Sequence, residues 1–168
     1  MKNLSQKPVL AGNPQQAAKR PQIVSTPPQK KWTFSFKYWK QINYFDVGAE
    51  NSKWFVSLFE RLSEMSSLTM DSILNDEASK EALRMHDINW EWKNIPINKS
   101  DIDWIPEEYW DKPEYPLIQF HVSRAKGRVA GFIDENNVFN IVLLDPKHNL
   151  QPCKFNGHKV INTRKCFS

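Results

Sequence analysis

Residues 117–144 read LIQFHVSRAKGRVAGFIDENNVFNIVLL, and this stretch contains three closely spaced strand patterns. The patterns are LIQFHVS (117–123), GRVAGFI (127–133) and VFNIVLL (138–144), each rich in the β-branched and aromatic residues that are typical of strands. Short polar links at 124–127 and 134–137 are typical of hairpin turns. The stretch therefore predicts an antiparallel three-stranded meander. Its last strand is apolar on both faces, which favours a central position in the sheet.

One strand and two helices are predicted before the meander. The segment WTFSFKYW (32–39) alternates aromatic and polar residues, which predicts a strand with its aromatic side chains on one face. Residues 52–65 show helical spacing, with one apolar face made of Trp54, Phe55, Leu58, Phe59, Leu62 and Met65. A second helix is predicted from about Thr69 to Arg84, and the short link at 66–68 makes the two an antiparallel hairpin. The predicted fold is α+β in the order β-α-α-β-β-β, with an antiparallel sheet packed against the helix hairpin.

Charge divides the chain into three parts. Residues 1–31 carry +6, contain no aromatic residue and are rich in Pro, Gln and Lys, which predicts a disordered basic arm. Residues 147–168 carry +5, so the overall +4 leaves −7 for residues 32–146. A single α+β domain is expected over 32–150, with an acidic insertion rich in Trp and Pro at 85–116 and an irregular basic tail at 151–168. An acidic body excludes a uniformly basic nucleic-acid-binding platform, although basic ends can still be attracted to phosphate.

Several function classes find no support in the residues. No apolar run is long enough to span a bilayer and no signal-peptide core is present, so a cytoplasmic protein without a membrane partner is expected. Cys153 and Cys166 are the only cysteines. Two cysteines do not make a disulfide framework, although a single disulfide between them remains an alternative. Together with His148 and His158, their spacing matches no zinc-finger pattern. We expect no metal and no cofactor.

Basic residues and histidines gather around the meander in the sequence. Arg124, Lys126 and Arg128 surround its first hairpin, His121 precedes them, and Lys147 and His148 follow the last strand, while Arg84 and His86 lie near the end of the second helix. If the sheet folds back on the helices, these side chains can line one concave face. Cations there can hold a phosphodiester, and a histidine can move the proton of a ribose 2′-hydroxyl. The predicted catalytic residues are Arg128, His148 and His121, and the predicted substrate-binding residues are Arg124, Lys126, Lys147 and Arg84.

Each of these residues also has an ordinary structural interpretation. Arg124 and Lys126 can be solvated turn residues, and His121 can be a partly exposed surface histidine. Arg84 can be a cation that complements the dipole at a helix C-terminus.

The segment FHVSRAKGRVAGFIDENNVFNIVLLDPKHNL (120–150), together with the predicted element order, resembles the RelE/ParE toxin superfamily of bacterial toxin–antitoxin systems. The resemblance is one of pattern and covers about residues 32–150. For RelE-like members it implies ribosome-dependent cleavage of mRNA, and for ParE-like members inhibition of gyrase, with a small antitoxin as partner. It would make Arg128 the arginine of the meander and His148 the polar group after the last strand. The acidic body and the insertion at 85–116 depart from the family pattern.

A non-catalytic interaction module, related to phage or defence systems, is the alternative function. In this interpretation Trp104, Tyr109 and Trp110 are exposed within the acidic insertion and bind a protein partner. Large aromatic side chains are common anchors of protein interfaces.

Overall fold

The computed structural model describes residues 29–110, 112–123, 125–151 and 159–163. The predicted disordered arm therefore lies outside the described residues up to position 28, as do Arg124, Cys153 and Cys166. The described residues that precede Trp32 are already attached to the domain. Lys31 forms a β-bridge with Thr69, and the Met70 N–H donates to the Lys30 carbonyl at 2.9 Å. Ordered contacts thus start before Trp32, the residue at which the sequence predicted the domain to begin.

The fold is a mixed α+β structure with a five-stranded sheet in the order β1-β5-β4-β3-β2. The three strands of the predicted meander are present as β3 (Ile118–His121), β4 (Arg128–Ile133) and β5 (Val138–Asp145), and they pair antiparallel. Two features differ from the predicted sheet. β1 (Thr33–Ser35) pairs with β5 in parallel, and a short additional strand, β2 (His86–Asp87), pairs with β3. The prediction of a purely antiparallel four-stranded sheet was therefore wrong.

β1 is shorter than the alternating pattern at 32–39 predicted. A turn closed by the Trp39 N–H and the Phe36 carbonyl, 3.1 Å apart, ends the strand. Beyond this turn the aromatic side chains no longer share one face, because Phe36 is 42% exposed and Tyr38 packs in a different core cluster from Trp32. The alternation of aromatic and polar residues in the sequence thus continues past the end of the strand.

The first predicted helix is present as α1 (Ser52–Ser67). The side chain of Asn51 caps it by accepting the Trp54 N–H at 3.2 Å. Most of the predicted apolar face is buried, but Phe59 is 59% exposed. Phe59 follows the buried Leu58 by one position, and such neighbours on a helix point in different directions.

The second predicted helix is divided into α2 (Met70–Leu74) and α3 (Glu77–Leu83). The break falls at Asn75 and Asp76. The Asp76 carboxylate accepts the Ser79 N–H at 2.9 Å and so caps a new helix. A continuous helix over 69–84 was therefore a wrong prediction.

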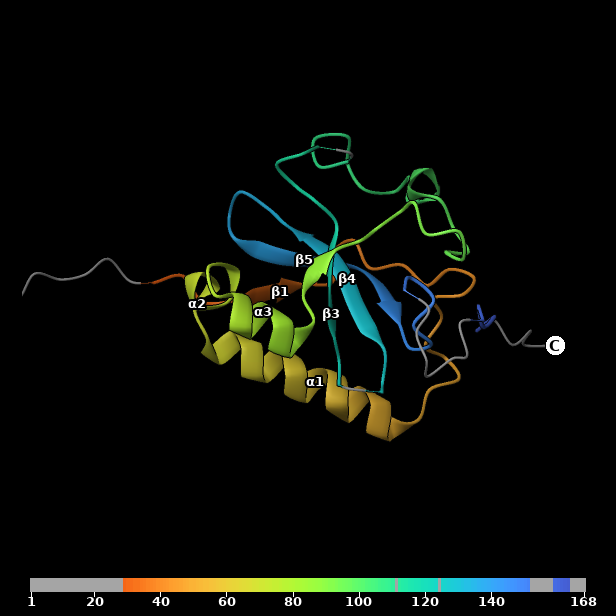
Figure 1. The fold of residues 1–168 in the computed structure, drawn as a ribbon, viewed down its shortest axis with the longest axis horizontal. Coiled ribbons are helices and arrows are strands. Elements are labelled where there is room, and N and C mark those ends of the chain that lie inside the picture. The colour runs from red at the N-terminus through yellow and green to blue at the C-terminus, as the bar shows by residue number, and fades with distance from the viewer. Residues whose placement is uncertain (1–28, 111, 124, 152–158, 164–168) are drawn as a thin grey trace, which may run out of the picture.

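The sheet has a core on each face. On one face, α1 and the α2–α3 pair enclose a cluster that includes Leu58, Met65 and Phe120. On the other face, the segment 88–117, which contains the short 3-10 helix η1 (Lys99–Asp101), covers a second cluster that includes Phe132 and Leu143. Figure 1 shows the two coverings on opposite sides of the strands, with α1 below and the green segment 88–117 above. The predicted acidic insertion is thus a layer of the domain.

Within the described ranges, no helix combines the length and the apolar character that crossing a bilayer requires.

Candidate functional site: a basic pocket beside the β3–β4 hairpin

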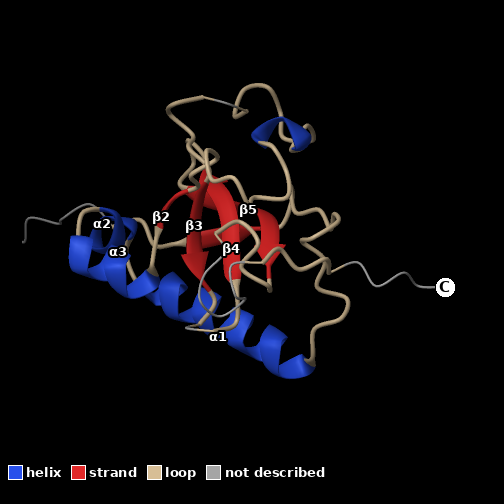
Figure 2. Ribbon diagram, turned by 45° about the vertical axis from the view of Figure 1, so that its right-hand side comes forward, coloured by secondary structure: helices blue, strands red, loops and turns tan. Residues whose placement is uncertain are grey.

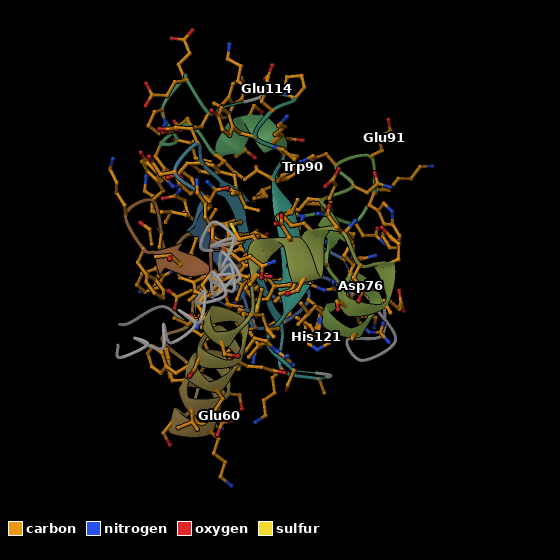
Figure 3. The ribbon with its side chains drawn as sticks, turned by 90° about the vertical axis from the view of Figure 1, so that its left-hand side faces the viewer. Glu60, Asp76, Trp90, Glu91, Glu114 and His121 are labelled. Atoms are coloured by element: carbon orange, nitrogen blue, oxygen red, sulfur yellow. The ribbon has the colours of Figure 1, made fainter. Side chains whose placement is uncertain are left out.

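Three ionisable residues, His121, Arg128 and Asp145, lie side by side on neighbouring strands. His121 of β3 lies opposite Arg128 of β4, and Arg128 lies opposite Asp145 of β5. Their neighbours along the strands, such as Phe120, Val129 and Leu144, belong to the core that α1 covers. Side chains alternate between the two faces of a strand, so His121, Arg128 and Asp145 lie on the face of the sheet opposite that core. Figures 1 and 2 show that this end of the sheet lies beside α1. In Figure 3, His121 lies on the helix side of the molecule, away from Trp90 and Glu114 of the insertion.

Asp145 organises the turn that follows β5. Its side chain is fully buried, and its two carboxylate oxygens accept the N–H groups of Asn149 and Leu150, each at 2.8 Å. Burial raises the pKa of Asp145 to about 6, while these hydrogen bonds and the charge of Arg128 act in the opposite direction. Asp145 therefore fixes the turn 146–150 and supplies a counter-charge to Arg128.

Asn149 connects this turn to two distant segments. Its side-chain amide donates to the carbonyls of Tyr44 and Ile161 and accepts the Ile161 N–H, each at 2.8 Å. The Thr163 hydroxyl oxygen adds a contact by accepting the Asp46 N–H at 3.0 Å. The described tail residues 159–163 are therefore held against the loop that precedes α1.

His148, a predicted catalytic residue, is used to hold the hairpin. Its Nε2 accepts the Gly127 N–H at 3.2 Å, and the residue is 6% exposed. Burial and the charge of Arg128 lower the pKa of His148 to about 4, although a hydrogen bond with the backbone of Ala125 raises it. His148 is thus a neutral side chain that joins the turn 146–150 to the β3–β4 hairpin.

His121 is buried, which corrects the interpretation of it as a partly exposed surface histidine. It is 9% exposed, and its Nε2 lies 3.3 Å from Nη2 of Arg61. Arg61 extends from α1 and also donates from Nε to the Val122 carbonyl at 3.1 Å. Burial, followed by the charges of Arg61, Arg84 and Arg128, lowers the pKa of His121 to about 4. Three arginines therefore lie close enough to act on one neutral imidazole.

A pocket of about 340 Å³ opens beside this cluster, between α3, β2 and β4. Arg84 ends α3 in the left-handed conformation, with φ of 49°, and its side chain lines the pocket. Lys80 also lines it but is paired with Glu77 at 2.8 Å. The lining residues are Glu77, Lys80, Glu81, Arg84, Met85, His86, Arg128 and Gln151.

His86 and Arg128 meet in this pocket. Nδ1 of His86 lies 2.8 Å from the Asp87 carbonyl, which can only accept, so Nδ1 is the donor and Nε2 holds the lone pair. This Nε2 lies 3.5 Å from Nη1 of Arg128. Because a guanidinium only donates, this contact uses the Nε2 lone pair of His86. A phosphate that takes up the Arg128 guanidinium would leave Nε2 able to accept the proton of a neighbouring hydroxyl. The sequence placed His86 near the site without a role, and it indicated no role for Arg61.

The other predicted substrate-binding residues are not all brought to the pocket. Lys126 is directed to α1, where its Nζ donates to the Ser57 hydroxyl at 2.5 Å and its carbonyl accepts from the Trp54 indole. Lys147 forms an ion pair with Glu50 at 2.5 Å. Arg84 and Arg128 line the pocket, whereas Arg124 lies outside the described residues.

The predicted partner-binding aromatics are half-buried rather than exposed. Trp104 donates its indole N–H to the Tyr38 carbonyl at 2.8 Å, and the Tyr109 hydroxyl donates to Glu135 at 3.0 Å. Trp110 lines a second pocket of about 380 Å³ together with Ser100, Asp103, Ile105 and Glu107. Part of each aromatic side chain therefore contributes to the core, and the accessible part belongs to an acidic surface.

Comparison of the chain with models of known protein families, with curated proteins and with solved structures gives no match in any of the three.

Proposed function

We propose that this chain is a metal-independent endoribonuclease whose reacting phosphate binds in the pocket lined by Arg84, His86 and Arg128. The observation that carries the proposal is the 3.5 Å contact between His86 Nε2 and Arg128 Nη1 within a pocket of about 340 Å³. The contact joins a proton acceptor to a fixed positive charge. That pair is what cleavage of RNA by its own 2′-hydroxyl requires.

His86 acts as the general base in this reaction. Its Nε2 accepts the proton of the ribose 2′-hydroxyl, and the 2′-oxygen attacks the adjacent phosphorus. The bond from phosphorus to the 5′-oxygen breaks, and this oxygen takes a proton from solvent. The products are a 2′,3′-cyclic phosphate and a free 5′-hydroxyl, so no further reactant is consumed.

Arg128 and Arg84 stabilise the negative charge that develops on the phosphate oxygens. Arg128 is 5% exposed and lies opposite Asp145, so its guanidinium is held in place before the substrate arrives. A preorganised cation in a site with little water stabilises a transition state more than a mobile surface cation does. Guanidinium groups also bind phosphate through two parallel hydrogen bonds.

The resemblance to RelE-like toxins favours mRNA as the substrate, with the ribosome presenting it and an antitoxin as inhibitor. The charge of −7 over residues 32–146 supports this choice, since an acidic body binds free RNA weakly. Cleavage that depends on a larger assembly is consistent with a small basic pocket on an acidic domain.

The test is an RNA cleavage assay with and without ribosomes, in EDTA, using the purified full chain and the His86→Ala variant. We expect fragments that end in a 2′,3′-cyclic phosphate from the wild-type chain and none from the variant. Expression of the wild-type gene should also arrest growth. Intact RNA in both settings, together with harmless expression, would rule out the nuclease.

A protein-interaction module is the second candidate, and the Trp110 pocket favours it. Asp103 and Glu107 beside an indole can receive a basic side chain of a partner. This candidate predicts partner capture that Trp110→Ala abolishes and that His86→Ala leaves unchanged.

A further inference from the structure

Strand β2 separates the basic pocket from a second pocket at the edge of the sheet. Its two residues are His86 and Asp87, and the side chains of consecutive strand residues point to opposite faces. His86 lines the basic pocket, whereas Asp87 lines the second pocket, which has a volume of about 240 Å³. We call this second one the Trp90 pocket, and its lining residues are Asp87, Ile88, Trp90, Lys99, Lys112, Pro113, Pro116 and Leu117. Because β2 is last in the strand order, a chain-like ligand can pass over it and occupy both pockets.

The Trp90 pocket gathers the positive charge of an otherwise acidic segment. Residues 94–116 contain six acidic side chains and two basic ones, Lys99 and Lys112. Both lysines line this pocket, although they are far apart in the sequence. Asp87 is the one carboxylate among the described lining residues, so the lining carries a net positive charge. Two lysines brought to one place within a segment of opposite charge indicate an anionic ligand.

The indole of Trp90 gives the pocket a flat apolar wall. The Ile88 N–H donates to the Leu117 carbonyl at 3.0 Å, which extends the pairing of β2 with β3 and fixes the chain just before Trp90. Trp90 is half-buried, since it packs against the core cluster that contains Phe132 and also lines the pocket. Proteins bind single-stranded nucleic acid with this combination, because bases stack on an aromatic ring while cations hold the phosphates. An acidic peptide would pair with the lysines but has no base to stack on the indole.

We infer that the Trp90 pocket is a subsite for single-stranded RNA, in which a base stacks on Trp90 while Lys99 and Lys112 hold a phosphate of the same strand. The strand then passes over β2, and a neighbouring phosphate lies in the basic pocket at Arg128. A base can stack in this way only when it is unpaired, so the subsite selects single strands over duplexes. That the bound strand is a substrate rests on the proposed function, whereas binding in the Trp90 pocket does not.

The subsite is tested by fluorescence anisotropy of a short, labelled 2′-O-methyl oligoribonucleotide, titrated at low salt with the full chain. The 2′-O-methyl group prevents attack by the 2′-oxygen, so the assay measures binding alone. Trp90→Ala should weaken binding about tenfold, which corresponds to the loss of one stacked base. Trp90→Phe, which keeps a flat ring, should weaken it less. Trp92→Ala is the matched control, because Trp92 is 42% exposed and does not line the pocket.

The lysines are tested by the salt dependence of the same binding. Lys99→Gln and Lys112→Gln should each lower the slope of log affinity against log salt by about 0.7, the value for one phosphate contact of a single strand. Lys93→Gln, which changes an exposed lysine outside the pocket, should leave the slope unchanged. These variants keep the core contacts of Trp90, so they test the subsite even if Trp90→Ala unfolds the domain.

Unchanged affinity in Trp90→Ala and unchanged slopes in both lysine variants would overturn the inference. Equal affinity for an abasic strand of the same length, or for a duplex, would also overturn it, as would displacement of the oligonucleotide by oligoglutamate at equal concentration. A chain that binds as expected but cleaves no RNA, with or without ribosomes, would contradict the nuclease and leave the subsite in place. Cleavage by a chain whose binding Trp90→Ala does not alter would contradict the subsite alone.

Discussion

Nη1 of Arg128 and Nε2 of His86 lie 3.5 Å apart, although one side chain is almost fully buried in the sheet and the other is exposed at its edge. This difference in burial separates the two residues experimentally. Removal of Arg128 leaves the buried Asp145 without its neighbouring cation, and uncompensated buried charges are strongly destabilising. Removal of His86 affects only the pocket. His86 is therefore the better residue with which to test function.

His86→Ala should keep the fold and lose the activity. Surface substitutions usually change the free energy of unfolding by less than about 0.5 kcal/mol, whereas loss of a general base lowers a rate by about 10² to 10⁴. Urea unfolding and RNA cleavage, measured on the same preparation, check the two parts. A variant that cleaves at the wild-type rate would remove His86 from the mechanism.

Asn149→Ala should destabilise the domain and release its tail. The substitution removes three hydrogen bonds of a fully buried side chain, and each contributes about 1 kcal/mol, so we expect a loss of roughly 3 kcal/mol. Limited trypsin digestion should then cut after Lys159 faster than in the wild type. Asn136→Ala, an exposed turn substitution, serves as the control. Equal digestion rates would show that Asn149 does not hold residues 159–163.

Gly127→Ala should disrupt the hairpin that carries the site. Gly127 has φ of 100°, and a Cβ there would collide with the Asp145 carbonyl and with Pro146. Steric conflict with rigid backbone adds to the strain of a positive φ, so a loss of several kcal/mol is expected. Urea unfolding measures it, and Lys126→Ala, one residue earlier and on the exposed side of the turn, should change stability far less.

The domain should lose stability between pH 6.5 and pH 4. His121 and His148 have ordinary pKa values of 6.5, which folding lowers to about 4, so in this range the unfolded chain binds two protons that the native chain does not. Each contributes roughly 3 kcal/mol to the loss. Asp145 has the opposite effect on stability, because folding raises its pKa from 3.8 to about 6. The stability that it gains on acidification offsets about the loss caused by one histidine. Urea unfolding at several pH values should show a net loss on acidification, and a stability that rises toward pH 4 would contradict it.

The strands of the meander could be predicted because each is a run of β-branched and aromatic residues bounded by turn residues, and α1 because its apolar residues recur at helical spacing. The extent of β1 could not, since the alternation of aromatic residues continues through the turn at Phe36–Trp39. The break at Asn75–Asp76 carried a signal that was missed. Asp76 is a preferred N-cap residue, and its carboxylate accepts the Ser79 N–H.

The candidate site was only partly predictable for a different physical reason. Arg84 and Arg128 line one pocket, and His121 lies opposite Arg128 on the neighbouring strand. The role of His148 depends on the conformation of Gly127, and that of Arg61 on how α1 lies over β3. Neither relation leaves a local pattern in the sequence, because tertiary packing alone creates it.

The parallel pairing of β1 with β5 has a consequence for synthesis of the chain. Thr33 meets Val138, so β1 leaves the ribosome well before β5 and must wait for it before gaining a partner. Until then the apolar side of α1 and the ring of Trp32 have no completed sheet to cover them. Nascent chains that end before β5 should therefore be recognised by chaperones, and closure of the domain should wait until β5 has been synthesised.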